Sequence, residues 1–458
     1  MAHGIAQVVE RGMCVGCGAC SIRTGGAISV ALGPIGLYQA DLRSATEGQL
    51  ESASRVCPFS DAAKDEDQLA SERHGELERD QRIGRHLSIH VGRLTDPDRL
   101  MGSSSGGLTS WLLERLLDQG IGDAVIHVGR GEGGELFEYR ISQTAADLLN
   151  SRKSIYSSTT LTDVIQRIRG DGSRYIVVGV PCFIRALRLL ADEQPDLGEQ
   201  LSFYVGLVCG HLKSQFFAES LGWQAGVRPE ALESIDFRIK NPRRRTYAYD
   251  YEARGRADRR SHRRRVASTI DGDWAFGAFQ PEACNFCDDV FAETADVVLG
   301  DAWLPRFTSD WRGTNVVVTR DVRARDILLE GAARGDVELE TVTAGEAAQS
   351  QGGNFRHRRD GLRVRLADDI ARGLSVPRKR VQPGYDHVTP QRIELIRQRR
   401  SISALSLVAF ADAKATGDFR AYAAPMRTAI RRYRRIESAG LTWSARVTAT
   451  LRRWRRRW

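Results

Sequence analysis

The run Tyr175-Ile-Val-Val-Gly-Val180, followed by Pro181-Cys182 and the amphipathic stretch Phe183–Leu190, is the part of the sequence that decides the fold. A short apolar run that leads into an amphipathic helix is typical of a buried strand in an α/β sheet. Comparable strand-like runs are Ala124–Val128, Ser202–Val208, Asp296–Leu299 and Asn315–Thr319, and Thr109–Leu117 is another amphipathic stretch. Apolar strands that alternate with helices predict a mixed, largely parallel α/β domain with both faces of its sheet covered.

The cysteines ahead of this domain carry the strongest chemical signal. Cys14-Val-Gly-Cys17-Gly-Ala-Cys20 places three thiols on a short loop that can wrap around a 4Fe-4S cluster. A bacterial ferredoxin run would have its fourth cysteine where this chain has Thr24; the next cysteine is Cys57, which precedes a proline as ferredoxin-type fourth ligands do. We therefore assign these four cysteines to one cluster. A zinc site is the alternative, although zinc sites usually pair two separate C-x-x-C or C/H knuckles.

Four more cysteines are dispersed through the α/β domain. Cys182 and Cys209 each follow a predicted buried strand, and Cys284 and Cys287 form a C-x-x-C pair further along. Because the carboxyl ends of strands in an open α/β sheet face a common crevice, Cys182 and Cys209 are expected to lie close together. The four thiols suffice for a second 4Fe-4S cluster. The alternative is that Cys182 and Cys209 are small buried apolar residues, since free cysteine is often fully buried.

Two glycine-rich stretches raise the question of phosphate binding. Gly102-Ser-Ser-Ser-Gly-Gly107 leads into a predicted helix, where backbone N–H groups and hydroxyls can cradle a phosphate of a flavin nucleotide. The same residues are also ordinary helix caps. Gly129-Arg-Gly-Glu-Gly-Gly134 matches G-x-G-x-x-G, but the residues after it, Glu135–Ile141, are typical of a strand, so a hairpin turn is predicted there.

Composition and charge divide the chain into four segments: a cluster-binding domain at 1–61, a linker or exposed helix at 62–86, an α/β domain at 87–352 and a helical, arginine-rich extension at 353–458. Clustered cysteines indicate metal binding in a reducing compartment. No window is apolar enough for a spanning helix. We therefore expect a cytoplasmic protein.

The net charge of +9 comes from the end of the chain. From Met426 onward there are eleven arginines and one acid, Glu437, so that this segment carries +10 and the rest of the chain −1. Trp443, Val447, Leu451, Trp454 and Trp458 recur at helical spacing among arginines, as in an interfacial helix at an anionic membrane. Peripheral contact with the inner face of the membrane is the interpretation; a helix docked on the body and a nucleic-acid arm are the alternatives.

The motifs taken in order resemble those of the coenzyme F-420 hydrogenase/dehydrogenase family of beta subunits. They are C-x-x-C-G-x-C at 14–20, C-P at 57–58, S-S-G-G-L-T at 104–109, S-R-K-S-I-Y at 151–156, V-V-G-V-P-C at 177–182, C-G-H at 209–211, C-N-F-C-D-D at 284–289 and A-D-V-V-L-G-D at 295–301. The resemblance spans about residues 10–320. The chain departs from many relatives in having no second ferredoxin cysteine run near residue 57 and in its basic C-terminus.

The resemblance implies FAD, at least one 4Fe-4S cluster, and hydride exchange with a deazaflavin or another two-electron partner. Carried over residue by residue, it implies that Lys153 lies close to the flavin as the catalytic candidate and that Val180-Pro181 forms a floor beside the ring. The residues implied to contact the flavin are Ser104, Ser105, Gly106, Gly107 and Thr109.

The sequence is thus interpreted as an iron-sulfur flavoprotein oxidoreductase whose other partner is ferredoxin or another one-electron carrier. Lys240 and the run Arg243–Arg245 are further candidates for neutralising reduced flavin or an anionic substrate, although an exposed face also explains the arginines. One alternative is a ferredoxin-dependent reductase of an organic metabolite, for example in cell-surface polysaccharide synthesis, without a deazaflavin. Another is a zinc and nucleic-acid binding protein; in the main interpretation no nucleic acid is expected.

Overall fold

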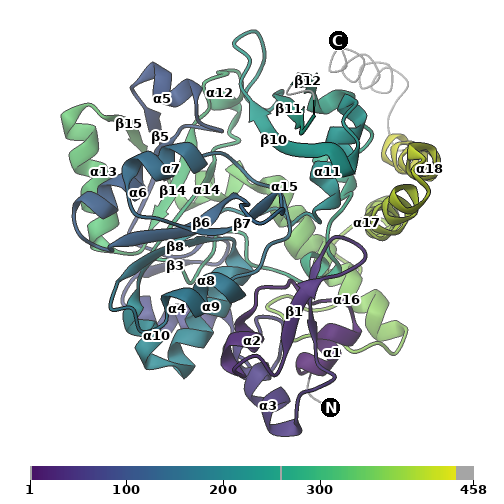
Figure 1. The fold of residues 1–458 in the computed structure, drawn as a ribbon, viewed down its shortest axis with the longest axis horizontal. Helices are drawn as coiled ribbons and strands as arrows, with labels where there is room; N and C mark the ends of the chain where they lie inside the picture. The colour runs from purple at the N-terminus through teal and green to yellow at the C-terminus, as the bar shows by residue number, and fades with distance from the viewer. Residues whose placement is uncertain (1–2, 258–259, 440–458) are drawn as a thin grey trace.

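The computed structural model describes residues 3–257 and 260–439, and its centre is a mixed eight-stranded sheet of order β15-β5-β14-β13-β9-β8-β6-β7 (Figure 1). The pairs β13–β9, β9–β8 and β8–β6 are parallel and the other four are antiparallel, so five of the eight strands run in one direction. All five predicted strands are present in this sheet. The strands are β5 (Ser88–Leu94), β6 (Ala124–Arg130), β7 (Phe137–Ser142), β8 (Tyr175–Gly179), β9 (Leu201–Leu207), β13 (Val297–Asp301), β14 (Asn315–Thr319) and β15 (Val337–Thr341).

Helices cover both faces of the sheet, as predicted. On one face Trp111 and Leu328 pack against Ile176 and Val205; on the other Ile184 packs in the cluster that contains Val177 and Tyr204. The first layer contains α6 (Leu108–Asp118), α7 (Ala145–Ser151) and α13 (Val322–Arg334), and the second contains α8 (Thr162–Ile168) and α9 (Pro181–Glu193). The α/β architecture is therefore confirmed.

Strand direction changes where the connections are short. β6 and β7 form an antiparallel hairpin around Gly131–Leu136, so the G-x-G-x-x-G stretch is a turn, as predicted. β14 returns antiparallel to β13 after a connection that contains only the one-turn helix α12 (Pro305–Thr308). A parallel neighbour would need a longer crossover.

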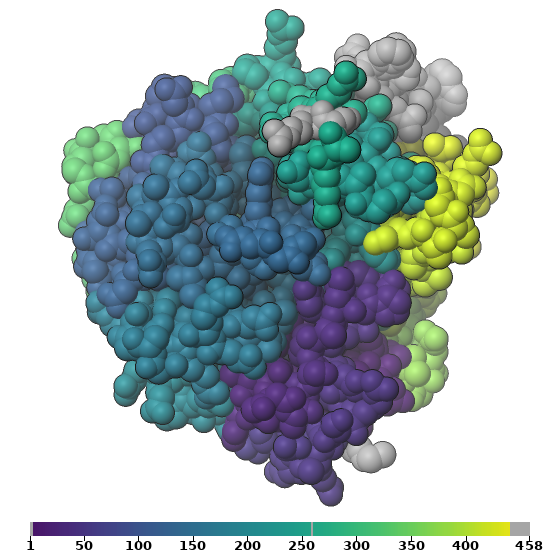
Figure 2. All heavy atoms as spheres, in the orientation of Figure 1, coloured from purple at the N-terminus to yellow at the C-terminus, as the bar shows by residue number. Residues whose placement is uncertain are grey.

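The N-terminal segment is packed directly on the α/β body, with α2 and α3 against α9, as the purple and blue-green surfaces of Figure 2 show. It consists of α1 (Ile5–Glu10), α2 (Ala19–Arg23), β1 (Ser29–Leu32), β2 (Tyr38–Asp41) and α3 (Glu47–Val56). The segment predicted to be a linker or an exposed helix contains α4 (Glu66–His74), β3 (Glu78–Asp80) and β4 (Gly84–His86), and one side of α4 is buried rather than exposed. Arg185 of α9 pairs with the buried Glu66 at 3.0 Å and donates to the Lys64 carbonyl, which explains this packing.

A second, three-stranded antiparallel sheet lies beside the main one and includes β11 (Asp250–Gly255), whose partners are β10 (Leu232–Ile239) and β12 (Ser261–Arg265). The predicted hairpin within 241–265 is present as β11 and β12. It is not exposed throughout, because Tyr251 is fully buried.

Between residues 353 and 439 the described chain is mostly helical, as predicted. Its helices are α16 (Gly361–Ala371), α17 (Pro390–Thr416) and α18 (Phe419–Ser438), after α14 (Ala344–Ser350), α15 (Gly352–Phe355) and a π-helical turn, η5 (Arg356–Asp360). Phe410 of α17 and Tyr422 of α18 pack with Phe279 of the body. None of the helices in the described part of the chain is long and apolar enough to cross a membrane. The tryptophan stripe from Trp443 lies outside the described residues.

The remaining helices lie between the elements given above. They are α5 (Pro97–Met101), α10 (Pro195–Gln200), α11 (Phe216–Ala225), η1 (Pro229–Ala231), η2 (Val266–Ser268), η3 (Trp274–Phe276) and η4 (Glu282–Asn285).

Candidate functional site

The structure brings the four N-terminal cysteines together. Cys14, Cys17, Cys20 and Cys57 all line one small cavity of about 20 Å³, whose other walls are apolar residues such as Met13. Burial raises the pKa of the Cys20 thiol well above its usual value, and the adjacent Cys17, Cys14 and Cys57 raise it further. Four thiols around one cavity that no carboxylate of the described residues lines fit the donor set of a 4Fe-4S cluster.

The glycines between these cysteines are required by the loop conformation. Gly16 and Gly18 have φ of 69° and 91°, in the left-handed region that favours glycine. A Cβ on Gly16 would collide with Tyr38, and one on Gly18 would collide with Thr162. Ala40 donates its backbone N–H to the Cys14 sulfur at 3.4 Å. The two glycines therefore let the cysteine loop approach strand β2 and helix α8 closely.

The other four cysteines form a second group of thiols. Cys182 is in the first turn of α9, Cys209 follows β9, and Cys284 and Cys287 are in the η4 loop, so the strand-end prediction for Cys182 and Cys209 agrees with the structure. Burial raises the pKa of Cys182 well above its usual value, and Cys287, Cys209 and Cys284 raise it further. The backbone N–H of Leu212 donates to the Cys284 sulfur at 3.2 Å.

Neither group resembles the site of a single ion. In the described residues, no set of three or more His, Cys, Asp or Glu side chains is arranged to hold one metal ion. In a 4Fe-4S cluster each thiolate binds a different iron, so the sulfurs stand farther apart than the ligands of one ion. The chemistry of the second donor set, four buried thiols, fits such a cluster as well.

One arginine lies within the second group. Arg358, in the π-helical turn η5, donates from Nη2 to the Cys209 sulfur at 3.3 Å and from Nε to the Gly210 carbonyl at 2.9 Å. Its side chain is only 1% exposed. Burial raises the pKa of the Cys209 thiol to about 11 in spite of this arginine, which lowers it.

The two thiol groups are neighbours. Cys17 contributes to the raised pKa of Cys182, and after burial, which is the main cause, Cys182 and Cys17 both raise the pKa of Tyr139. Tyr139 stacks on Phe183 with 5.9 Å between ring centroids. Both rings face a large cavity, described next, so the cavity and the two thiol groups are contiguous.

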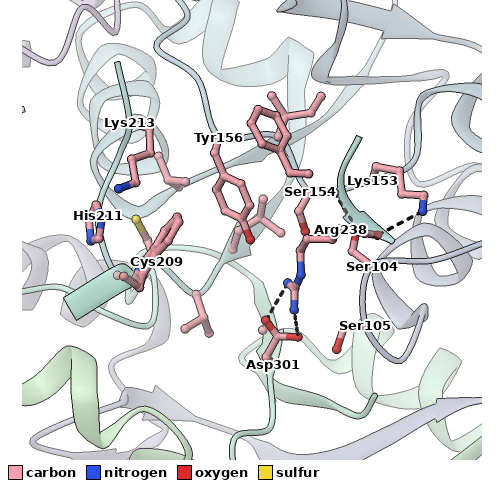
Figure 3. Close-up of a pocket in the computed structure, with 18 of the residues that line it drawn as sticks. Ser104, Ser105, Lys153, Ser154, Tyr156, Cys209, His211, Lys213, Arg238 and Asp301 are labelled. Atoms are coloured by element: carbon pink, nitrogen blue, oxygen red, sulfur yellow. Dashed lines mark hydrogen bonds and ion pairs between the residues drawn. The ribbon is translucent and has the colours of Figure 1, made fainter. Parts of the chain in front are cut away.

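The large cavity has a volume of about 1490 Å³ and lies at the carboxyl ends of β8, β9 and β13. Figure 3 shows its arrangement: Cys209, His211 and Lys213 lie at one end, Ser104, Ser105 and Lys153 at the other. Ligand pockets usually measure about 300–1,000 Å³. This cavity therefore has room for more than one ordinary ligand.

The predicted flavin-contact residues lie at the serine end. Ser104, Ser105, Gly107, Thr109, Lys153 and Val180 line the cavity. Gly106 and Pro181 do not line it, although both position residues that do. A Cβ on Gly106 would lie 2.7 Å from the Asn315 side chain and from the Gly92 carbonyl, so glycine lets the loop reach β14 and β5. Pro181 begins α9.

Lys240 fixes this serine loop rather than facing the cavity. Its ammonium donates to the carbonyls of Leu100 and Ser105 at 2.5 and 2.7 Å. Burial, followed by the charges of Lys153 and Arg238, lowers the pKa of Lys240 to about 7. Ser104 accepts a hydrogen bond from the Ser154 backbone N–H at 2.8 Å, which joins the loop to the S-R-K-S-I-Y stretch.

Lys153, the predicted catalytic residue, is at the edge of the cavity. Its ammonium pairs with Asp236 at 3.1 Å and donates to the Arg238 carbonyl at 3.4 Å. Its φ of 144° is a conformation that residues other than glycine rarely adopt. Such strained residues cluster at functional sites. The residues Arg243–Arg245 do not line the cavity; Arg244, for example, pairs with Asp250.

The middle of the cavity contains a charged pair that the sequence reasoning missed. Arg238 of β10 donates to both oxygens of Asp301, at 2.9 and 3.2 Å, and its guanidinium carbon is 4.6 Å from the centre of the Tyr249 ring. Asp301 ends β13, and its place at the carboxyl end of a strand in the A-D-V-V-L-G-D motif was the signal that could have found it.

Lys213 was also missed, because nothing in its local sequence distinguishes it. It is 1% exposed, donates to the Ala278 carbonyl, and has its ammonium 4.5 and 4.7 Å from the ring centres of Trp274 and Phe217. Burial lowers the pKa of Lys213 to about 7. A buried lysine beside aromatic rings in a cavity is a candidate for proton transfer or for binding an anion.

Comparison with known proteins shows the family of this chain. Residues 89–166 match the family described as the N-terminal part of the coenzyme F420 hydrogenase/dehydrogenase beta subunit, and residues 172–344 match the family described as the C terminus of that beta subunit. Together the matches cover more than half of the chain. They include the cavity-lining strands and all four cysteines of the second group, whereas the first group precedes them.

Individual relatives are distant. The chain is 26% identical over 214 residues to the F subunit of F(420)H(2) dehydrogenase from Methanosarcina mazei, which covers 45% of this chain and 55% of that protein. It is 23% identical over 265 residues to the beta subunit of coenzyme F420 hydrogenase from Methanosarcina barkeri, covering 57% and 84%. The chain thus spans about half the length of the first of these relatives.

Among solved structures, the chain is similar to one chain of the xenon-derivatised F420-reducing [NiFe] hydrogenase complex from Methanosarcina barkeri. The TM-score is 0.49 and the identity 18%, over 66% of this chain and 98% of that one. On the two family matches, the chain belongs to the coenzyme F420 hydrogenase/dehydrogenase family of beta subunits.

Proposed function

We propose that this protein is an iron-sulfur flavoprotein oxidoreductase with FAD in the large cavity and a 4Fe-4S cluster in each thiol group. It passes electrons between a two-electron hydride partner, which is a coenzyme F-420-like deazaflavin or an organic metabolite, and a one-electron carrier such as ferredoxin. When bound, FAD would exchange hydride with the small molecule and the clusters would carry single electrons.

The observation that carries this proposal is the contact between the cavity and the thiols. Cys209 belongs to the second group and also lines the cavity, and Cys182 of the same group is next to Cys17 of the first. A path from the cavity through eight thiols, five of them on buried cysteines, toward the N-terminal segment suits electron transfer. A protein with structural zinc knuckles would have no need of it.

The serine end of the cavity suits the phosphates of FAD. Ser104, Ser105 and Thr109 present hydroxyls at the beginning of α6, where the N-terminal end of the helix favours negative charge. Lys153 adds a positive charge at this end. Arg238, held by Asp301, can then orient the ring system against Tyr249 and Trp303.

The opposite end suits the hydride partner. Trp274, Phe217 and Tyr156 supply aromatic walls, and Lys213 supplies a cation or a proton donor depending on pH. The volume of about 1490 Å³ leaves space for this partner beside FAD. Because the M. mazei and M. barkeri relatives are named as enzymes of F420, a deazaflavin is the first substrate to test.

The first experiment is anaerobic purification followed by an absorption spectrum and by assays of iron, zinc and released flavin. We expect about eight irons and one FAD per chain, from two clusters of four irons. A colourless, zinc-loaded protein would refute the proposal. Serine variants then assign the irons: Cys20→Ser should lose those of the first group and Cys284→Ser those of the second.

Turnover separates the two possible hydride partners. Flavin reduction should follow the addition of reduced deazaflavin but not of NADH, with ferredoxin as the electron acceptor. A protein with all its cofactors that reacts with ferredoxin and ignores the deazaflavin would instead be a ferredoxin-dependent reductase of an organic metabolite.

A further inference from the structure

The two thiol groups differ in the charge that is next to them. Arg358 is the side chain that donates directly to a thiol of the second group, through Nη2 to Cys209. Thiols of the first group receive backbone donors instead, such as the Ala40 N–H on Cys14. The difference is therefore a full positive charge within hydrogen-bonding distance of one group only.

The charge of Arg358 is not neutralised elsewhere. Among the described residues, no carboxylate pairs with Arg358, and its Nη1 atom is buried with no hydrogen-bond partner. A buried donor without a partner is rare and indicates an acceptor that the protein chain does not supply.

Two other cations near these thiols are paired with acids. Arg185, which is near Cys57, pairs with Glu66 at 3.0 Å, and Lys379, which is near Cys287, pairs with Asp288 at 3.6 Å, so their fields at the thiols are largely cancelled. Lys213, which is near Cys284, has no carboxylate partner among the described residues, but it donates to the Ala278 carbonyl. Arg358 is therefore distinct among the described residues as the buried cation that donates to a thiol.

We propose that Arg358 raises the reduction potential of the cluster bound by Cys182, Cys209, Cys284 and Cys287, so that this cluster is the more readily reduced of the two. The inference rests on the proposed function. Reduction adds one electron and hence one negative charge to a cluster, so a nearby positive charge and a hydrogen bond to its sulfur stabilise the reduced form. This one-electron reduction of the cluster needs no proton or other reactant.

This arrangement gives the two clusters separate tasks. The second cluster, which borders the cavity through Cys209, would hold an electron that leaves the flavin, and the first would pass it outward at a lower potential. The π-helical turn that presents Arg358 is itself an unusual element, and such turns occur frequently at functional sites.

The test is a redox titration of the full-length protein with its cofactors, followed by electron paramagnetic resonance, on wild type and Arg358→Gln. We expect two reduction steps in the wild type. In the variant, the reduced-to-oxidised ratio of the second cluster at a fixed potential should fall at least tenfold, a downward shift of about 59 mV for one electron. The first cluster should keep its potential.

Arg365→Gln is the matched control. Arg365 is equally buried and lies two turns further along, but it donates to the carbonyls of Asn285 and His357 and not to a thiol. It should leave both potentials in place. Arg358→Lys keeps the positive charge but loses the planar guanidinium group, so we expect a smaller downward shift in the potential of the second cluster. If Arg358→Gln does not fold, the result for Arg358→Lys decides the test.

The failures are distinguishable. Eight irons with unchanged potentials in the Arg358 variants would overturn this inference and leave the proposed function standing. Equal shifts in the Arg358 and Arg365 variants would also overturn it, because they would show a structural effect. Four irons in the wild type, all retained in Cys284→Ser, would overturn the second cluster itself and this inference with it.

Discussion

Buried charge dominates the site at the scale of single residues. Lys213, Arg238 and Arg358 are all at least 95% buried, and each is held by a different kind of partner: aromatic rings, a carboxylate and a thiol. Burying a charge is costly unless a partner compensates for it. The free energies involved can therefore be measured by removing one partner at a time.

Lys213→Met should change how stability depends on pH. The pKa of Lys213 is lowered to about 7, so below pH 7 the native state carries a buried charge that the unfolded state keeps in water. The resulting loss of native-state stability is complete below pH 7. It decreases as the pH rises toward about 10.4, the pKa of lysine in the unfolded chain. We expect the difference in melting temperature, Lys213→Met minus wild type, to be largest at pH 6 and smallest at pH 9.

The comparison needs a control at the same site without a titrating group. Leu221→Ala, at a buried residue that also lines the cavity, should lower the melting temperature by an amount that does not vary across this pH range. A Lys213→Met difference that is equally flat would contradict the lowered pKa.

Asp301→Ala should leave the Arg238 guanidinium buried and unpaired. Removing one partner of a buried pair costs about 3–5 kcal/mol of unfolding free energy, and we also expect weaker retention of FAD, since Arg238 loses its orientation. Chemical denaturation and released flavin measure the two effects. Glu252→Ala breaks the exposed pair with Arg254 and should cost under about 1 kcal/mol, with flavin retained.

The sequence identified some of these residues and not others, for a physical reason. Cysteines are recognisable because their spacing follows from the geometry of a cluster, so the sequence assigned Cys14, Cys17, Cys20 and Cys57 to one cluster and left the other four as candidates for a second. Arg238 and Lys213 are recognisable as candidate functional residues only because they are buried. Their burial depends on side chains that are distant in the sequence. Among the missed residues only Asp301, at the end of a predicted strand, carried a local signal.

At the scale of elements, the loop between Cys14 and Cys20 depends on Gly18. Gly18→Ala adds a Cβ in a left-handed conformation against Thr162 and should displace the cysteines and release the iron of the first group. Gly25→Ala has a similar φ of 62° but nothing within 4 Å of the added atom, so it should cost about 1–2 kcal/mol and keep the iron. Iron and acid-labile sulfide assays on both variants check this.

Strands and helices followed from periodicity, whereas their pairing did not. The predicted strands are all present, because their apolar runs are long enough to be buried on both faces. The antiparallel return of β14 was not predicted. It depends on the short connection after Asp301, which contains only the one-turn helix α12. A connection of this kind does not form the long helical crossover that a parallel neighbour needs.

At the scale of the whole molecule, the C-terminal helices are part of one core with the cavity. Phe410 packs on Phe216, Phe279 and Tyr422, and Phe217 of the same cluster lines the cavity. Phe410→Ala should therefore cost about 3–5 kcal/mol and also weaken FAD retention. Val408→Ala, on the same helix but 65% exposed, should do neither.

The number of unfolding transitions tests this view of the C-terminal segment. A single cooperative transition that shifts as a whole in Phe410→Ala agrees with a shared core. Two separate transitions, of which only the smaller one moves, would instead describe an independent helical extension.

The burial of the second thiol group also constrains the order in which the protein is made. Cys209 is buried and accepts a hydrogen bond from Arg358, which is also buried and lies far downstream of it. Inorganic iron and sulfide would have to reach these thiols while the chain around residues 356–360 is still open. Maturation would then be a step of biosynthesis: a cluster lost from the closed protein could be replaced only after partial unfolding of its C-terminal third.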